Sequence, residues 1–166
     1  MSIKTRAQEL IDTLQLHPHP EGGWFREEFR SISQVQPLDA QAQRSALTAI
    51  YFLLESHQHS HWHRVSSDEV WVYLEGDTLN LWSWDALNQG TICTRLGPVE
   101  INTNQRPQHT IAAELWQAAW PSNTSQHGYT LVACMVGPGF DFSDFTMLED
   151  NSDVAVQMRL AGLPGC

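Results

Sequence analysis

The sequence predicts an all-β fold, a sandwich or a barrel, preceded by one short N-terminal helix. Six segments of six to ten residues, each rich in Val, Ile, Leu, Trp or Tyr, follow one another: 46–55, 69–76, 78–85, 91–96, 114–120 and 129–136. Turn-forming clusters such as EGD, NQG and LGP separate them, and no helical periodicity intervenes. Short strands at this spacing are typical of all-β sandwiches and barrels.

The N-terminal helix is expected over about residues 5–16. Thr5 and Gln8 have the spacing of a capping box, in which side chains satisfy the free amides of the first turn. Apolar residues then recur on one side of the helix: Ala7, Leu10, Ile11 and Leu14. The helix should stop near Leu16, because the sequence HPHPEGG brings two prolines and two glycines.

The rest of the chain is expected to form a barrel over about residues 24–148 and a short tail, all within a single domain, 1–166. Hydrophobic residues make up 42% of the chain and charged residues 17%, which is typical of a folded domain rather than a disordered one. Around residues 154–159 the tail is expected to form either a short helix or an edge strand.

The composition limits the partners and the compartment. Nine basic and 19 acidic residues give a formal charge of -10, and so negative a surface repels nucleic acid and anionic membranes. Neither is expected as a partner. No apolar run reaches membrane-spanning length and no signal-peptide pattern is present, so the expected location is cytoplasmic. The cysteines share no short spacing and are interpreted as reduced thiols: Cys93, Cys134 and Cys166.

Four histidines alternate along the stretch from His57 to His63. Residues two apart lie on one face of a strand and, at about 3.3 Å per residue, are near enough to bind one metal ion, whereas the ends of the row lie roughly 20 Å apart. At most one neighbouring pair can therefore share an ion. The favoured pair is His61 and His63, because Trp62 and Val65 beside them are typical of a strand, while the first two histidines lie in a polar stretch.

A carboxylate follows the histidines. Glu69, Trp71 and Tyr73 alternate with aliphatic residues, so they share one face of the next predicted strand. Two histidines, one carboxylate and an open position are the general form of a catalytic divalent-metal site, here His61, His63 and Glu69. The alternative is that the histidines are partly exposed and that Glu69 is a hydrogen-bonded residue of a barrel mouth. Spacing alone leaves both interpretations open.

These residues also carry a resemblance to a small, functionally uncharacterised family of the cupin superfamily. The stretches that carry it are LHPHPEGGWFREEFRS (16–31), SALTAIYFLLE (45–55), HWHRVSSDEVWVYLEGD (61–77), LWQAAW (115–120) and LVACMVGPGFDFSDF (131–145). The spacing from His61 and His63 through Glu69 to Gly76 resembles the first conserved cupin motif. The resemblance implies a cupin-type jelly-roll β-barrel, usually paired into a homodimer, with a small-molecule site in the barrel mouth.

The resemblance places His61, His63, Glu69 and Gln117 in that site. Gln117 stands where metal-binding cupins usually have a histidine, and an amide oxygen is a weaker ligand than imidazole for first-row metals. The sequence therefore leaves a divalent metal, Fe, Mn, Ni or Zn, open as a cofactor, and Gln117 is expected either to be a weak ligand or to contact the substrate.

Further side chains are expected to contribute from other segments. Arg26 or Glu27 can reach the mouth from the stretch EGGWFREEFR, where an arginine would hold a carboxylate or a phosphate. Trp71 is expected to line the substrate site. Asp141 or Asp144 would supply a second acid.

Three functions stay open from the sequence. The first is a metal-free isomerase or epimerase on a sugar-like or carbonyl substrate, with His63 as general base, Tyr73 as acid and Glu69 orienting the histidine. The second is a divalent-metal enzyme, an oxygenase or an isomerase, whose ion is held by His61, His63 and Glu69. The third is a non-catalytic protein that binds a small polar metabolite.

Overall fold

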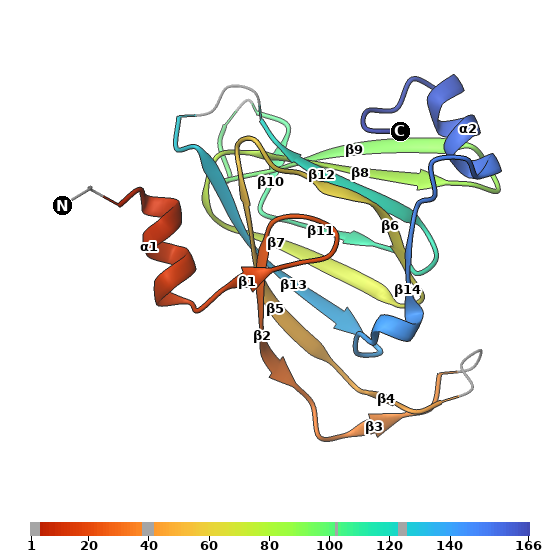
Figure 1. Cartoon of the computed structure of the whole chain (residues 1–166), viewed down its shortest axis with the longest axis horizontal. Helices are drawn as coiled ribbons and strands as arrows, with labels where there is room; N and C mark the ends of the chain where they lie inside the picture. Colours follow the sequence, from red (N-terminus) through yellow and green to blue (C-terminus); the bar gives the residue numbers. More distant parts are fainter. Residues whose placement is uncertain (1–3, 38–41, 102, 123–125) are drawn as a thin grey trace.

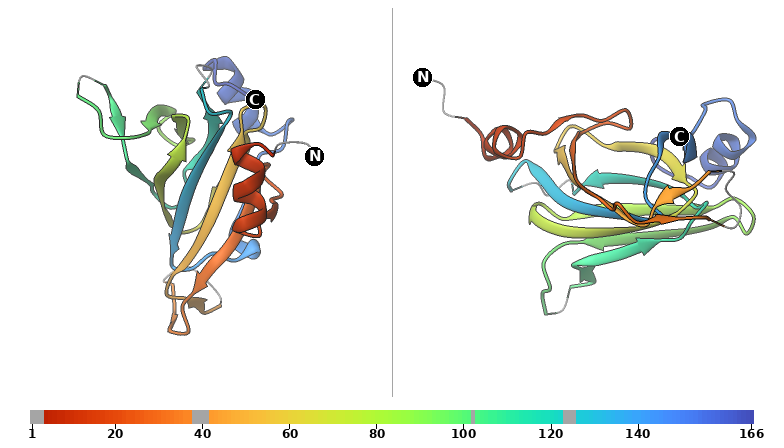
Figure 2. Two further views of the ribbon diagram at one scale, coloured as in Figure 1. Left: turned by 90° about the vertical axis from the view of Figure 1, so that its left-hand side faces the viewer. Right: turned by 90° about the horizontal axis from the view of Figure 1, so that it is seen from below.

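Two six-stranded sheets face each other in the computed structural model, which describes residues 4–37, 42–101, 103–122 and 126–166 (Figures 1 and 2). The first sheet has the order β1–β2–β5–β13–β7–β11, with the bounds His17–Pro18 (β1), Trp24–Arg30 (β2), Thr48–Glu55 (β5), Tyr129–Gly137 (β13), Asp68–Gly76 (β7) and Gln108–Ile111 (β11). The second has the order β10–β9–β8–β12–β6–β14, with the bounds Gln105–Arg106 (β10), Gly90–Leu96 (β9), Leu79–Asp85 (β8), Trp116–Pro121 (β12), Ser60–Val65 (β6) and Phe145–Met147 (β14). A separate pair joins β3 (Gln34–Val35) to β4 (Arg44–Ser45).

The six apolar segments predicted as strands correspond to β5, β7, β8, β9, β12 and β13, so the expected all-β class is confirmed. Their alternating side chains form the core between the sheets, where Phe52, Leu54 and Trp71 of the first sheet meet Leu79 and Leu81 of the second. Burial of these side chains supplies the main driving force for closing the two layers.

One face of β7 differs from its expected environment. Glu69, Trp71 and Tyr73 do share a face, but it is the inner face of the sandwich, and Trp71 is fully buried there. The aliphatic face, expected to be core, lies outside: Val70 and Val72 are only partly buried. A β-sandwich has a single interior, and on β7 the side chains that face it are those of Trp71 and Tyr73.

The N-terminal helix α1 spans Arg6–Thr13 and is shorter than predicted. The Thr5 hydroxyl accepts a hydrogen bond from the Gln8 amide at 3.3 Å, as the capping pattern indicated. The helix ends early because Gln15 adopts a left-handed conformation, φ 54°, which reverses the chain before Leu16. Its apolar side packs on the outer face of the first sheet, against residues that include Leu53 (Figure 1).

The C-terminal tail forms helix α2, Asp153–Leu160, so the alternative of an edge strand is wrong. Ser152 caps the helix through a hydrogen bond from the Ala155 amide. Met158 packs on the outer face of the second sheet with Trp62 and Trp84. Neither α1 nor α2, the two α-helices of the described residues, has the length and apolar character needed to cross a membrane.

Candidate functional site

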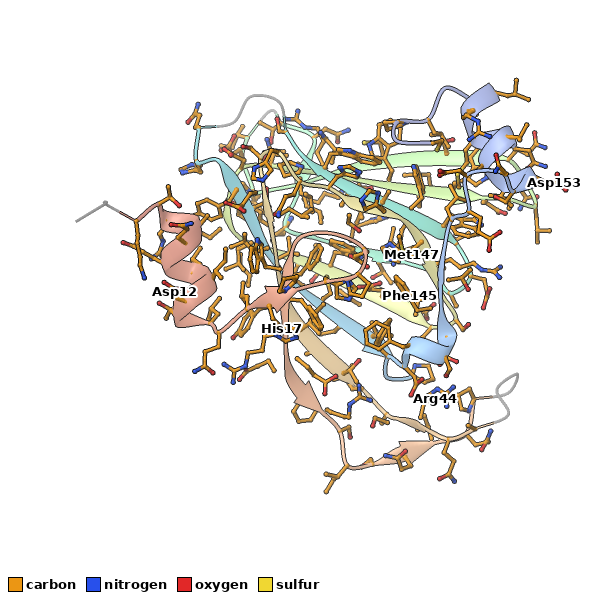
Figure 3. The ribbon with its side chains drawn as sticks, in the orientation of Figure 1. Asp12, His17, Arg44, Phe145, Met147 and Asp153 are labelled. Carbon is orange, nitrogen blue, oxygen red and sulfur yellow. The ribbon has the colours of Figure 1, made fainter. Side chains whose placement is uncertain are left out.

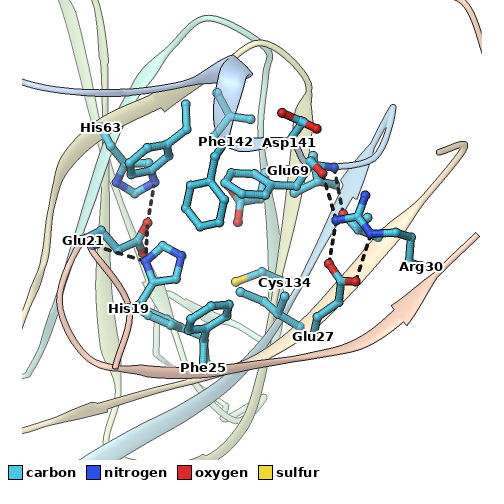
Figure 4. A pocket seen from close by; sticks show the side chains of 17 residues that line it. His19, Glu21, Phe25, Glu27, Arg30, His63, Glu69, Cys134, Asp141 and Phe142 are labelled. Atoms are coloured by element: carbon cyan, nitrogen blue, oxygen red, sulfur yellow. Dashed lines mark hydrogen bonds and ion pairs between the residues drawn. The ribbon is translucent and has the colours of Figure 1, made fainter. Parts of the chain in front are cut away.

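A cavity of about 240 Å³ lies between the two sheets, lined by strands β2, β5, β6, β7 and β13, by the turn before β2 and by the segment before β14 (Figure 4). Its wall is mostly apolar and includes five phenylalanines: Phe25, Phe52, Phe140, Phe142 and Phe145. Polar groups gather at one part of this wall, where Glu21, His63 and Glu69 are 6%, 1% and 7% exposed. A largely apolar pocket with a few convergent polar groups is the usual form of a small-molecule site.

The Gln117 amide links the two sheets inside the fold. Its Oε1 accepts a hydrogen bond from Trp71 Nε1 at 3.1 Å, and its Nε2 donates to Glu69 Oε2 at 2.6 Å and to His63 Nε2 at 3.1 Å. Because an indole nitrogen can only donate, the Trp71 contact fixes which way the amide faces. Gln117 therefore presents its NH₂ group to both His63 and Glu69.

The hydrogen bonds of His63 assign its tautomer. Its Nδ1 lies 2.7 Å from the His61 carbonyl oxygen, which can only accept, so Nδ1 carries the proton. Nε2 is then the acceptor for the Gln117 amide. Burial lowers the pKa of His63 despite the nearby Glu69, which keeps the imidazole neutral and its Nε2 lone pair available.

The Glu21 carboxyl faces this lone pair. Its Oε2 lies 3.2 Å from His63 Nε2, and its Oε1 accepts a hydrogen bond from the Ser60 hydroxyl at 2.9 Å. Burial raises the pKa of Glu21 to about 8, against a smaller lowering by Ser60. His19 Nδ1 accepts the Glu21 backbone amide at 3.2 Å, which fixes the ring against the turn. At neutral pH the raised pKa keeps Glu21 protonated, and its O–H shares His63 Nε2 as an acceptor with the Gln117 amide.

Glu69 is the second buried carboxyl of the pocket. Burial raises its pKa to about 7, and the Glu21 charge adds to that rise, while His63 and Gln117 oppose it. Burial also raises the pKa of the adjacent Cys134 thiol well above its usual value, with the two carboxyls adding to the effect. Cys134 therefore stays a thiol and lines the wall without acting as a nucleophile.

The turn before β2 delivers Glu21 to the pocket. Gly22 and Gly23 have φ values of 105° and 73°, a region that favours glycine. The His61 amide donates to the Glu21 carbonyl oxygen at 2.7 Å, and Gly22 packs so closely on the His59 carbonyl that a Cβ there would overlap it. The pattern HPHPEGG predicts a helix stop but does not reveal His19 and Glu21 as pocket residues. The paired glycines after an acid were the available signal.

We expect a Gly22→Ala variant to lose about 2–4 kcal/mol of unfolding free energy, since it combines a strained φ with a backbone overlap. Displacement of the turn should also withdraw Glu21 from the pocket. Gly162→Ala is the control, because Gly162 also has a positive φ, 73°, but nothing within 4 Å of the added Cβ. Urea unfolding of both variants measures the difference. Equal losses would show that backbone strain alone, and not contact with the His59 segment, sets the cost.

A β-bulge in β6 decides which histidine enters the pocket. Gln117 pairs with His63, yet Ala119 pairs with Ser60, so β6 carries one extra residue at this point. Ser60 and His63 both face the interior as a result, and His61 is exposed. The expectation that His61 and His63 point into one pocket is wrong, because the bulge breaks the alternation on which it depended.

The chain matches the family model described as Cupin superfamily (DUF985) over residues 8–148. It belongs to the cupin superfamily. This cupin is similar to a hypothetical protein from Leishmania major, with 32% identity, a TM-score of 0.82, and coverage of 98% of this chain and 96% of that one. It is also similar to a protein from Shewanella oneidensis, with 28% identity, a TM-score of 0.80, and coverage of 96% and 94%. Among curated proteins, no sequence matches.

More distant structures share the cupin fold alone. Oxalate decarboxylase from Bacillus subtilis is 14% identical over 92% of this chain and 36% of that chain, with a TM-score of 0.58. That enzyme contains Mn(II) centres. The family match and these neighbours confirm the expected cupin-type jelly roll.

The ligand set expected from the cupin motif does not fit a metal here. His61 lies outside the pocket, and at the fourth position Gln117 presents an NH₂ group, which has no lone pair to offer a cation. Among the residues that the structure describes, no group of three or more His, Cys, Asp and Glu side chains is arranged to hold a metal ion. His63 and Glu69 are instead engaged with Gln117.

Three other expected site residues lie elsewhere. Trp71 is buried in the core against Phe52 and is not among the residues that line the cavity. Tyr73 is four residues along β7 from Glu69, or about 13 Å, and its hydroxyl donates to the Gly76 carbonyl oxygen at 2.6 Å. It cannot be the acid that works beside His63. Arg26 points away from the cavity, because Phe25 and Glu27 on either side of it in β2 line the cavity. Its guanidinium donates to the carbonyl oxygen of Leu14, at the C-terminal end of α1, at 3.2 Å.

The mouth of the cavity carries an ion pair. Glu27 lines the cavity as expected, but Arg30 holds it through two hydrogen bonds of 2.7 and 2.9 Å. Asp141 also lines the mouth. Asp144 does not line the cavity; it forms a two-bond ion pair with Arg44, which secures the segment whose Phe145 faces the cavity. Arg44 and Phe145 are labelled in Figure 3.

Proposed function

We propose that this cupin is an acid–base enzyme, an isomerase or epimerase, that enolises a small neutral carbonyl compound without a metal ion. The observation that carries the proposal is the convergence of Glu21, His63 and Glu69, all buried, on one part of an otherwise apolar cavity. Pairs of titratable groups held in such surroundings are typical of acid–base sites.

In the proposed reaction the substrate carbonyl lies between the two carboxyls. Glu69, whose pKa of about 7 suits a general base at neutral pH, takes a proton from the carbon next to the carbonyl. The carbonyl oxygen takes the proton of the Glu21 carboxyl, and an enol forms. For epimerisation the enol turns its other face to Glu69, which returns its proton to the same carbon while the enol oxygen returns its proton to Glu21. For isomerisation of a hydroxyketone, Glu69 returns its proton to the former carbonyl carbon, whose oxygen keeps its proton, and the neighbouring hydroxyl gives its own proton to Glu21 and becomes the new carbonyl. No redox change or co-reactant is needed.

The other polar residues have positioning roles. Gln117 holds Glu69 and His63 through its two N–H groups, and Trp71 keeps that amide from turning. His61 contributes its backbone carbonyl, which sets the His63 tautomer. Because the cavity walls exclude water, each of these hydrogen bonds is stronger than it would be in solvent.

The cavity favours the carbonyl substrate over the sugar-like one. A sugar needs many hydrogen-bond partners, whereas five phenylalanines line this wall. Arg30 is the one arginine or lysine among the lining residues, and its Nε and Nη2 already donate to Glu27 and to the Phe140 carbonyl oxygen. The Glu27 carboxylate neutralises its charge, which disfavours carboxylates and phosphates as substrates. A neutral aldehyde or ketone with an apolar side fits best.

Exchange of carbon-bound protons in D₂O tests the proposal. The purified protein is incubated with a panel of small aliphatic and aromatic aldehydes, ketones and hydroxyketones, and deuterium incorporation next to the carbonyl is followed by NMR. We expect exchange with at least one apolar member and none with the Glu69→Gln variant. Binding of panel members without exchange would replace the proposal by a non-catalytic binding protein.

Elemental analysis of untagged protein tests the metal alternative. We expect that the amount of Fe, Mn, Ni or Zn bound through His63 is well under one equivalent per chain, because Gln117 directs N–H groups at the position where a metal ion would lie. We also expect the activity to withstand chelators. His63→Ala is the comparison variant. One equivalent of metal in the wild type that disappears in this variant would contradict the proposal.

A further inference from the structure

Two histidines of the alternating row remain outside the pocket on the surface. His59 and His61 lie next to each other at the start of β6, with ring centroids 4.2 Å apart. His61 is exposed and His59 is partly exposed. Neither lines the cavity, and neither has a role in the proposed reaction beyond the backbone of His61.

We propose that His59 and His61 form a surface site for one first-row transition-metal ion, with Cu(II) bound more tightly than Zn(II). Two imidazoles bound side by side to one ion, at metal–nitrogen distances of about 2.0–2.1 Å, have ring centres roughly 4–5 Å apart. The observed separation of 4.2 Å is within this range. Imidazole suits both metals, and the general order of affinities places Cu(II) above Zn(II).

The surroundings hold the His59 ring and the His61 backbone in place before an ion binds. The His59 ring stacks on Trp120, with centroids 5.4 Å apart and ring planes 11° from parallel. The backbone beside His61 is fixed by the hydrogen bond from its amide to Glu21 and by the close approach of Gly22 to the His59 carbonyl. Side chains already ordered lose little conformational entropy on binding, which favours affinity.

The exposure of the pair also suits a metal ion. The exposed side of the pair leaves room for water to complete the coordination. The negative charge of the chain, -10, attracts cations to the surface in general.

This site is separate from the pocket and does not depend on the proposed function. It does share a backbone with the pocket, since the His61 peptide group accepts from His63 and donates to Glu21. The bulge in β6 thus turns one histidine inward for acid–base chemistry and leaves its neighbours as an outward pair.

Copper titration of untagged protein tests the site, with Trp fluorescence and calorimetry as readouts. We expect one Cu(II) per chain with a dissociation constant in the micromolar range, and at least about tenfold weaker binding in His59→Gln and in His61→Gln. His109→Gln, on β11, is the matched control and should bind as the wild type does. Because His59 stacks on Trp120, the Trp120→Phe variant should bind one Cu(II) with a smaller loss of fluorescence.

Circular dichroism before each titration confirms that the variants are folded; His61 is exposed, so His61→Gln should fold normally. Wild-type affinity in both His59→Gln and His61→Gln would overturn the proposal, as would equal weakening in His109→Gln. Zinc titration provides the second ion, and Zn(II) binding tighter than Cu(II) would overturn the proposed preference. Absence of carbonyl exchange activity would leave these results unaffected, so the two proposals fail independently.

Discussion

Replacing Glu21 by Gln is expected to slow carbonyl exchange by about 10²–10⁴-fold, the usual contribution of a general acid or base, while the protein stays folded. A glutamine at this position can accept the Ser60 hydroxyl with its oxygen and donate to His63 Nε2 with its NH₂ group, as the protonated carboxyl does. The side-chain amide of this glutamine cannot transfer a proton to the substrate near neutral pH. The variant therefore separates the chemistry of Glu21 from its hydrogen bonds.

Two measurements on this variant are needed together. Single-turnover or NMR exchange rates report the chemistry, and urea unfolding at pH 6, where Glu21 is protonated, should give a free energy within about 1 kcal/mol of the wild type. Glu28→Gln is the matched control, because Glu28 is an exposed carboxylate on β2, the strand that follows the Glu21 turn, and should leave both quantities unchanged. Full exchange activity in Glu21→Gln would show that Glu21 is not the acid.

The strands could be predicted from the sequence because period-two burial is a local property. Each residue of β5 or β13 alternates between the interior and the outer face regardless of its partners, so apolar composition and turns were enough. The same reasoning misplaced His61. A bulge depends on how β6 pairs with β12, and one inserted residue reverses the face of every side chain before it.

The candidate site could be predicted only in part, since its groups come together through tertiary structure. His63, Glu69 and Gln117 were expected, but the role of Gln117 was not: it depends on Trp71, which lies 46 positions away in the sequence and in the opposite sheet. Glu21 belongs to a turn with no periodicity of its own. Its place in the pocket follows from contacts with the β6 backbone that no local pattern encodes.

The free energy of unfolding should fall as the pH rises from 7 to 8.5, by roughly 1–2 kcal/mol, at about 1.4 kcal/mol per pKa unit. Glu21 and Glu69 have folded pKa values of about 8 and about 7, above the usual value of 4.5. Above pH 4.5 the unfolded chain releases both protons while the folded protein keeps them. Each carboxyl therefore loses its stabilising contribution as the pH rises toward its folded pKa. His19 and His63, whose folded pKa values are lowered, act in the opposite direction and mainly below pH 6.5.

Urea unfolding of the wild type and of Glu21→Gln across this pH range isolates the contribution of Glu21 ionisation to the free energy of unfolding. The glutamine does not ionise, so the variant should lose most of the pH dependence and become more stable than the wild type at pH 8.5. The same change would then slow exchange and raise stability at pH 8.5, because a carboxyl buried in an apolar cavity disfavours folding when it is ionised and is kept there for its chemistry. A wild type whose stability stays flat from pH 7 to 8.5 would show that Glu21 is already ionised in the folded protein at pH 7, so it would have no proton with which to polarise the substrate.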